Sequence, residues 1–313
     1  MNVFDTFINI SNNKVSNKTI INDIAKSFNS KVQVLKIKNF ADSEINLNLK
    51  NFPSFKNKTI LINGQFEFNK QNSINEQLMN LFFVLDTIKK TMPKKMILLI
   101  PYLPYSRQEV GINNHLGPLE VVLNNIQNTG ISKIICCDLH EPSIIKNFKN
   151  LFIEIRFDII WQNLIKSLKI KNIALASPDK GGSSRVKRIA EALNIDYVLI
   201  TKKRIKDDLA VPIKLDGDVK NKTIILIDDI IDTSRTAINA CNLLLKNGAK
   251  EVFGCFAHGI LSKNSSTLIN KSKFKKIFVT NSVTSVSKLK NKKIDIISVN
   301  DYLTKQINTK KYD

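Results

Sequence analysis

Two adjacent carboxylates stand where an apolar segment ends. Asp228 and Asp229 directly follow four apolar β-formers at 224–227. Such a run suits a strand buried on both faces of a parallel sheet, and open α/β sheets bind ligands at the carboxyl ends of their strands. Neighbouring carboxylates can accept hydrogen bonds from vicinal sugar hydroxyls or hold Mg2+. The pair therefore predicts a site for a sugar, a cation or both.

A loop with several hydroxyl groups follows the acid pair. It contains Asp232, Thr233, Ser234 and Thr236, and apolar residues with helical spacing come next, at 237–245. The first N–H groups of a helix favour a phosphate, and the hydroxyls can add hydrogen bonds. The alternative is a solvated acidic turn that caps the helix through Asp232 or Thr233. Acid pair and loop together suit a sugar phosphate.

Other polar side chains also follow apolar strands. Arg107 and Gln108 end a proline-rich loop and offer planar donors that suit a phosphate and a base. His140 and Asp179 each lie just beyond a strand, and two glycines after Asp179 permit a ligand to approach the backbone. Considered alone, Arg107 has the alternative of being a surface charge, and His140 has the alternative of being a structural histidine.

Two further groups complete the candidates. Lys202 and Arg204 belong to a basic cluster after an apolar strand, for which a solvated turn is the alternative. Phe40, Asp42 and Glu44 precede a segment in which apolar and polar residues alternate, which is typical of a half-exposed hairpin arm. Nothing in that pattern by itself requires a ligand.

The elements that must position these residues alternate between strand and helix. We expect an α/β fold with two similar domains, each a mainly parallel sheet flanked by helices, divided into residues 1–150 and 151–313. Apolar periodicity predicts helices at 19–28, 74–90, 119–126 and 159–168, and strands at 32–37, 59–63, 96–100, 134–137, 173–176, 197–201, 252–257, 277–280 and 294–298.

Composition narrows the class of protein. The formal net charge is +21, but the lysines are dispersed and neither a zinc-finger spacing nor an RNA-binding aromatic motif is present, which does not favour nucleic acid as the partner. Four cysteines lie in or beside apolar runs, as expected for reduced, buried thiols. Neither a long apolar span nor a secretory leader is evident, so we expect a cytoplasmic protein without a membrane partner.

Five segments resemble one family in order. FADSE is similar to an adenine-side hairpin, PYLPYSRQE to a nucleotide loop, DLHEP to a metal-binding histidine segment, SPDKGG to a substrate loop, and TKKR with DDIIDTSRT to a catalytic lysine strand and ribose-phosphate loop. The last loop is shared with type I phosphoribosyltransferases, but the set resembles the ribose-phosphate diphosphokinases. The resemblance implies a phosphoribosyltransferase-like fold and transfer of the diphosphoryl group of ATP to ribose 5-phosphate, which releases AMP.

Roles follow from this resemblance residue by residue. It implies ATP binding by Phe40, Asp42, Glu44, Arg107 and Gln108, with the first three serving a neighbouring subunit of a homo-oligomer built from dimers, a hexamer being one arrangement. It implies Mg2+ at His140 and Asp179. It implies ribose 5-phosphate binding by Asp228, Asp229, Asp232, Thr233, Ser234 and Thr236, and stabilisation of the transferred charge by Lys202 and Arg204.

The chain departs from the family pattern in three places. Arg235 stands where the family usually has glycine, which allows a positive φ and close approach to a phosphate. Segments 109–119 and 144–148 lack the family's usual regulatory residues, so we expect weak regulation by ADP. A plain phosphoribosyltransferase and a non-catalytic relative that serves as a binding subunit stay open as alternatives.

Overall fold

The computed structural model divides the chain into two compact units. The first unit contains residues 1–155 and 299–313, and the second contains residues 156–298. The structure describes residues 3–11, 19–42, 44–47, 49–68, 73–108, 117–148, 150–179, 181–206, 209–284, 286, 290–310 and 312, and of 145–146 and 202–214 the backbone alone. The chain passes from the first unit to the second after residue 155 and returns to the first for its last fifteen residues.

The first unit is built on a six-stranded sheet in which all neighbouring strands are parallel. The strand order is β2-β1-β5-β6-β7-β8. The bounds are β1 Thr6–Ser11, β2 Val32–Lys36, β5 Thr59–Asn63, β6 Lys95–Leu99, β7 Lys133–Cys137 and β8 Phe152–Ile155. A separate antiparallel hairpin joins β3 (Lys38–Asn39) to β4 (Ile45–Asn46), and a short 3-10 helix covers Leu49–Asn51.

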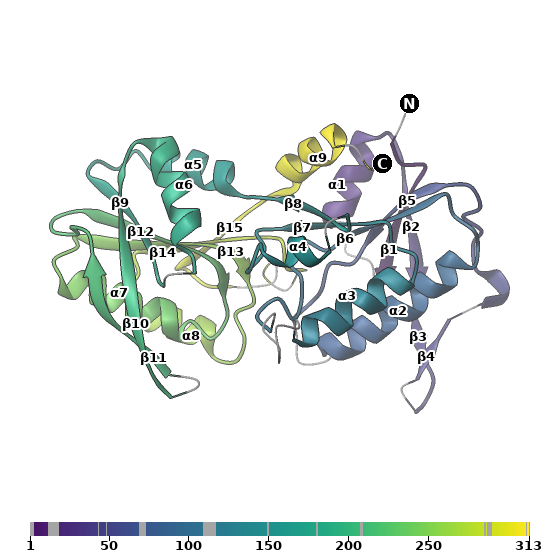
Figure 1. Cartoon of the computed structure of the whole chain (residues 1–313), viewed down its shortest axis with the longest axis horizontal. Helices are drawn as coiled ribbons and strands as arrows, with labels where there is room; N and C mark the ends of the chain where they lie inside the picture. The colour runs from purple at the N-terminus through teal and green to yellow at the C-terminus, as the bar shows by residue number, and fades with distance from the viewer. Residues whose placement is uncertain are drawn as a thin grey trace. The chain divides into compact units, whose positions relative to one another are not determined.

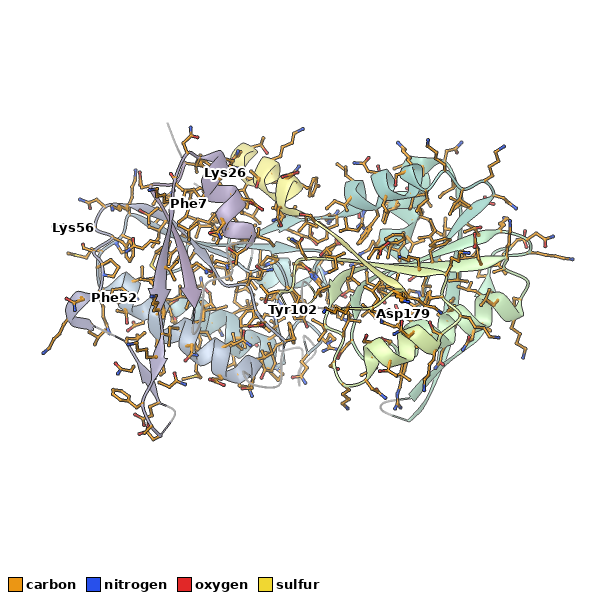
Figure 2. All side chains as sticks on the ribbon, turned by 180° about the vertical axis from the view of Figure 1, so that it is seen from behind. Phe7, Lys26, Phe52, Lys56, Tyr102 and Asp179 are labelled. Atoms are coloured by element: carbon orange, nitrogen blue, oxygen red, sulfur yellow. The ribbon has the colours of Figure 1, made fainter. Side chains whose placement is uncertain are left out.

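Helices cover both faces of this sheet (Figure 1). The helices α1 (Ile20–Ser27) and α9 (Asn300–Thr309) lie on one face, while α2 (Ile74–Lys89) and α3 (Pro118–Asn128) lie on the other; α4 spans Ile144–Asn147. Phe7 on β1, labelled in Figure 2, is fully buried, and its ring centroid lies 5.7 Å from that of Phe4. Burial on both faces explains why the strands read as continuous apolar runs.

The end of the chain completes the first unit. On α9, Leu303 and Ile307 are fully buried, and the helix packs against α1. Tyr312 places its ring 5.0 Å from that of Phe4, and its carbonyl oxygen accepts a hydrogen bond from Lys95 Nζ at 3.0 Å. The helix α9 therefore supplies part of the cover that α1 alone does not provide.

The second unit is built on a seven-stranded sheet with the order β11-β10-β9-β12-β13-β14-β15. Its strands are β9 Ile173–Ser177, β10 Asp196–Lys206, β11 Leu209–Asp216, β12 Thr223–Ile231, β13 Glu251–Gly259, β14 Lys276–Thr280 and β15 Ile294–Ile297. Among the described strands of this sheet, β10 and the edge strand β11 pair antiparallel and the other neighbours pair parallel. Figure 1 shows α5 (Asp158–Ser167) and α6 (Ser183–Leu193) on one face, with α7 (Arg235–Lys246) and α8 (Ser265–Lys271) on the other.

Each sheet reverses its strand order at one point. The chain starts each sheet at an inner strand and adds β2 in the first sheet, or β10 and β11 in the second, on one side. It then crosses to the other side, so the reversals lie between β1 and β5 and between β9 and β12. Crevices for ligands form at the carboxyl ends of strands at such points. In the first unit, Asn63 Nδ2 donates to Asn9 Oδ1 at 2.8 Å across this position, whereas in the second unit carboxylates gather there.

The expected fold class is confirmed, and several elements differ in detail. The edge strand β8 was not among the predicted strands. Strand β1 and helix α9 were not predicted, because their apolar residues are too few for a clear period. All four cysteines are buried and free, as expected. Among the described helices, none combines the length and apolar character needed to cross a lipid bilayer.

Candidate active site

Asp228 and Asp229 lie within β12, which continues to Ile231 rather than ending at residue 227. The last pair between β12 and β9 joins Leu226 to Ala176, so both carboxylates lie beyond the paired part of β9. Pairing with β13 continues past them, which explains the longer strand. Asp229 is buried, and its N–H donates to Asp228 Oδ1 at 3.0 Å. The acid pair is thus held at the carboxyl edge of the sheet where the strand order reverses.

A buried arginine faces the acid pair. Arg185 on α6 places Nη1 at 3.8 Å from Asp228 Oδ1 and 3.7 Å from Asp229 Oδ1. The side chain of Arg185 is 9 % exposed, so water screens these contacts only weakly. The sequence analysis missed this residue, although Arg185 shares the buried stripe of α6 with Val186 and Ile189. An arginine on an apolar helical stripe was the signal that could have revealed it.

Asp179 brings a third carboxylate to this edge. It follows β9, and Figure 2 labels it. Its Oδ1 accepts a hydrogen bond from the Gly182 N–H at 3.3 Å, and its carbonyl oxygen accepts one from Ser177 Oγ at 2.5 Å. A Cβ on Gly182 would lie 2.6 Å from Ser177 Oγ and 3.4 Å from Asp228 Oδ1. Glycine at 182 therefore lets this turn approach the acid pair.

Charge and burial change the acidity of Asp228. Burial is the largest cause that raises its pKa well above the ordinary value, and the charges of Asp229 and Asp179 raise it further. Arg185 acts in the opposite direction and lowers it. The single positive charge of Arg185 thus stands against three carboxyl groups, those of Asp179, Asp228 and Asp229, and cannot balance all of them when they are ionised. The edge is prepared to receive a cation or hydrogen-bond donors from a ligand.

The hydroxyl loop connects β12 to the start of α7. Asp232 and Thr233 are half-buried, Ser234 is buried, and Thr236 is exposed in the first turn of the helix. The Ser234 carbonyl accepts the N–H of Ile238 at 2.9 Å, which begins the helical hydrogen bonding. The N–H groups of the first helical turn lack intrahelical acceptors, a geometry that binds anions. The loop therefore joins the acid pair to the start of a helix, in the order that the sequence predicts.

The left-handed residue of this loop is Ser234 and not Arg235. Ser234 has φ +66° and ψ −8°, whereas Arg235 is the exposed first residue of α7. A left-handed conformation costs a residue with a Cβ about 1–2 kcal/mol. Arg235 itself has no positive φ in this structure, so the conformation that glycine favours belongs to the preceding residue. The hydroxyl of Ser234 contacts that of Ser265, the first residue of α8, and both residues are buried.

Lys202 and Arg204 lie on a ribbon that extends beyond the same edge. The last parallel pair of β10 with β9 joins Leu199 to Ser177, after which β10 continues to Lys206 and pairs only with β11. The backbone thus carries both basic positions past the strand end that precedes Asp179. Their side chains lie outside the described residues.

In the first unit, the candidates for nucleotide binding follow two neighbouring strands. Arg107 and Gln108 are exposed at the end of the loop after β6, and His140 is exposed after β7. The N–H of Cys137 donates to the Pro101 carbonyl at 2.9 Å, which holds the two strand ends together. Asp138, between β7 and His140, is buried with φ +39°. Polar groups from both loops therefore belong to one edge of the first sheet.

The hairpin of β3 and β4 carries the other three candidates. Phe40, Asp42 and Glu44 are exposed, and 55 % of Phe40 is accessible. The turn is held by the Phe40 N–H donating to the Glu44 carbonyl at 2.8 Å and by the Glu44 N–H donating to Asp42 Oδ1 at 3.0 Å. Figure 1 shows this hairpin extending away from the first sheet. An exposed phenylalanine beside two carboxylates is available to another molecule.

The carboxylates at the β9–β12 edge have the chemistry that Mg2+ prefers. Magnesium takes oxygen ligands, and in phosphate-transferring sites it keeps few protein ligands beside water and phosphate oxygens. Asp179 and Asp228 are two such oxygen donors in a region where negative charge is in excess. Within the described part of the chain, no group of three or more His, Cys, Asp or Glu residues is arranged as a metal site. The donor set therefore fits an ion that substrate phosphates help to bind.

Comparison with known families identifies both halves of the chain. Residues 11–130 match the family described as the N-terminal domain of ribose phosphate pyrophosphokinase. Residues 176–311 match the phosphoribosyl synthetase-associated domain. The second match begins within β9 and contains Asp179, Arg185 and the acid pair.

Several curated relatives match most of the chain. The ribose-phosphate pyrophosphokinase of Bacillus caldolyticus is 32 % identical over 304 residues, which cover 95 % of this chain and 93 % of the relative. The ribose-phosphate pyrophosphokinase of Bacillus subtilis is 30 % identical, with 93 % and 90 % covered. The structure of phosphoribosylpyrophosphate synthetase from Mycobacterium smegmatis has a TM-score of 0.82 at 23 % identity and covers 97 % of this chain and 98 % of that chain.

Proposed function

This chain belongs to the ribose-phosphate pyrophosphokinase family, and on that basis we propose that its two units divide the reaction between them. The enzyme transfers the diphosphoryl group of ATP to the anomeric hydroxyl of ribose 5-phosphate, giving phosphoribosyl diphosphate and AMP. The first unit supplies the ATP-side residues and the second holds the ribose phosphate. One observation carries this assignment: the acid pair, Arg185 and the hydroxyl loop meet where the second sheet reverses its strand order.

Ribose 5-phosphate binds along the end of β12. Asp228 and Asp229 accept hydrogen bonds from the vicinal ribose hydroxyls, because adjacent carboxylates match adjacent donors. The 5-phosphate binds at the start of α7, where N–H groups point outward. Its ligands come from one loop: Asp232, Thr233, Ser234 and Thr236, with Ser234 contributing its backbone.

ATP binds through exposed groups of the first unit. Arg107 and Gln108 contact its phosphates and base, since a guanidinium can bind a phosphate through two hydrogen bonds. The Phe40 ring and the acidic residues Asp42 and Glu44 contact the adenosine part from the projecting hairpin.

The transfer step makes one P–O bond and breaks another. The anomeric hydroxyl of ribose 5-phosphate loses its proton to water as its oxygen attacks the β-phosphorus of ATP, the bond to the oxygen shared with the α-phosphate breaks, and AMP leaves. Lys202 and Arg204, on the β10–β11 ribbon, neutralise the negative charge that develops on the transferred group. Positioning and electrostatics, rather than covalent participation of the protein, supply the catalysis.

We assign the metal to Mg2+ and its protein contacts to His140 and Asp179. When bound, the ion neutralises phosphate oxygens and helps to place the diphosphate. Asp179 is positioned for this by its hydrogen bond from Gly182. Burial first, and then the charges of Asp229 and Asp179, raise the pKa of Asp228, and a cation would balance that local negative charge.

We propose a homo-oligomer built from dimers, with a hexamer as one assembly. The exposed hairpin of one subunit contacts ATP in the site of its neighbour. Subunit mixing tests this: Phe40→Ala damages the hairpin and Asp228→Asn damages the ribose site. Mixing the two inactive variants, with reversible dissociation, regains activity if the hairpin acts in the neighbour, and does not if each chain uses its own hairpin.

The central experiment follows AMP release by the purified protein with ATP, Mg2+ and ribose 5-phosphate. AMP must appear only when ribose 5-phosphate is present, and the product must be consumed by a phosphoribosyltransferase supplied in excess. Chelation of the metal is expected to stop the reaction. A chain that uses phosphoribosyl diphosphate but does not form it would instead be a plain phosphoribosyltransferase.

A further inference from the structure

We propose that the buried contact between Ser234 and Ser265 sets the conformation of the ribose-phosphate loop. Ser265 is then a positioning residue for the 5-phosphate, although it lies on another helix. This inference rests on the proposed function, because it names what controls the loop assigned to ribose 5-phosphate.

The contact joins the starts of two helices. Ser234 precedes α7, Ser265 is the first residue of α8, and their hydroxyl oxygens contact each other although the residues are 31 positions apart. Ser234 is 4 % exposed and Ser265 is 0 % exposed. A hydrogen bond between buried hydroxyls is costly to break on one side only, since the remaining group stays without water. The two helix starts are therefore coupled.

The coupled residue is also the one with an unusual backbone conformation. Ser234 has φ +66°, a region that glycine adopts freely and residues with a Cβ do not. Its carbonyl accepts the Ile238 N–H at 2.9 Å, so its conformation determines where α7 begins. If Ser234 left this conformation, the N–H groups of Arg235 and Thr236 would change direction. The hydrogen bond with Ser265 opposes that change.

This arrangement also assigns the hydroxyls of the loop. The Ser234 hydroxyl is directed to Ser265, whereas Thr233 is half-buried and Thr236 is exposed. The threonines are therefore the side-chain hydroxyls that reach the phosphate, and Ser234 contributes through its backbone. Ser265 acts on the phosphate only through Ser234.

The test compares Ser265→Ala, Ser234→Gly and the double variant by calorimetric titration with ribose 5-phosphate. Ser265→Ala is expected to raise the dissociation constant about five-fold, the effect of losing one buried hydrogen bond. Combining it with Ser234→Gly is expected to return the constant to within roughly two-fold of wild type, because glycine holds a positive φ without help. Recovery by a second substitution is a result that general loss of packing does not give.

Ser266→Ala is the matched control. Ser266 is the next residue on α8, and its hydroxyl accepts a hydrogen bond from Asn291 Nδ2 at 2.9 Å, so this variant disturbs the same helix away from the loop. It is expected to bind ribose 5-phosphate as wild type does. In turnover assays, Ser265→Ala is expected to change KM for ribose 5-phosphate and to leave KM for ATP unchanged.

The two hypotheses fail in different ways. An unchanged or lower dissociation constant in Ser265→Ala, or a double variant no better than Ser265→Ala, overturns the positioning role. If wild type binds ribose 5-phosphate but releases no AMP, the proposed reaction is wrong while the binding series still decides the role of Ser265. A wild type that binds no ribose 5-phosphate overturns both.

Discussion

Arg185 Nη1 lies 3.8 Å from Asp228 Oδ1, and both side chains are largely shielded from water. The same nitrogen lies 3.7 Å from Asp229 Oδ1, so one guanidinium serves two carboxylates. These distances exceed those of a hydrogen bond, and the contact is electrostatic. Arg185 therefore opposes the rise in the pKa of Asp228 that burial, Asp229 and Asp179 cause, and it favours the ionised form of this carboxyl at the edge of the sheet.

Arg185→Met is expected to destabilise the second unit, and more so at about pH 8 than at about pH 5, by several kcal/mol at the higher pH. Without Arg185, the carboxylates repel one another when ionised, and protonation of Asp228, whose pKa is already raised, relieves the repulsion in acid. Urea unfolding at both pH values measures the difference. Arg188→Met is the control, since Arg188 on the same helix pairs with Asp158 at 2.9 Å. Equal destabilisation at both pH values would contradict the electrostatic role of Arg185.

Asp228→Asn is expected to stabilise the fold near neutral pH while it weakens ribose 5-phosphate binding. The folded-state pKa of Asp228 is raised by burial and by Asp229 and Asp179, so the stability it contributes is present below the unfolded pKa and is lost as pH rises through the folded pKa. Asparagine carries no charge at any pH and so removes the free-energy cost of burying an ionised carboxylate at position 228. Arg185 still has Asp229 as an ion-pair partner. A rise in Tm of about 2–4 °C corresponds to ~1 kcal/mol in a unit of this size. The gain should vanish in acid, and a lower Tm near neutral pH would show that the prediction is wrong.

Lys202→Ala is expected to lower kcat roughly a hundredfold or more while the dissociation constant for ribose 5-phosphate changes little. The reason is that a cation on the β10–β11 ribbon stabilises charge that develops only during transfer. Single-turnover kinetics with a separate binding titration measure the two effects. Lys220→Ala, which removes an exposed lysine from the turn before β12, is the control. Turnover near that of wild type would remove Lys202 from the catalytic residues.

Arg235→Gly is expected to raise KM for ribose 5-phosphate a few-fold at low salt and less at high salt, as for an exposed charge near an anion. Arg235 is exposed in the first turn of α7, and the positive φ belongs to Ser234, so glycine at 235 relieves no strain. The measurement is KM at two ionic strengths, with Arg235→Lys as the variant that keeps the charge. A lower KM that does not depend on salt would refute this expectation.

The sequence predicts β9, β12, β13 and β14 of the second sheet well because these inner strands are buried on both faces. Runs such as 224–227 have a pattern that a solvent-facing strand would not have, and polar residues mark their carboxyl ends. Strand β1 is also buried, but only three of its six residues are apolar, and helix α9 was missed because it has few apolar residues. Leu303 and Ile307 are the buried pair on an otherwise polar helix, and what fixes that helix is its contact with α1, far away in the sequence.

In the candidate site, too, the local sequence predicts what adjacent residues form and does not predict contacts between distant segments. Asp228, Asp229 and the loop after them could be read from local order, because strand, acids, hydroxyls and helix follow one another directly. Arg185 belongs to another segment and reaches the acids only when α6 packs on the sheet. The positive φ of Ser234 could not be read from the sequence, because the contact with Ser265 that accompanies it joins distant positions.

The return of α9 to the first unit has a consequence for synthesis of the chain. The second unit, residues 156–298, is one uninterrupted segment, whereas the first unit needs residues from both sides of it. Domains fold as units while the chain emerges from the ribosome, at about 5–20 residues per second. The first unit therefore cannot be completed until the whole of the second unit has been translated, although it contains the residues that are translated first.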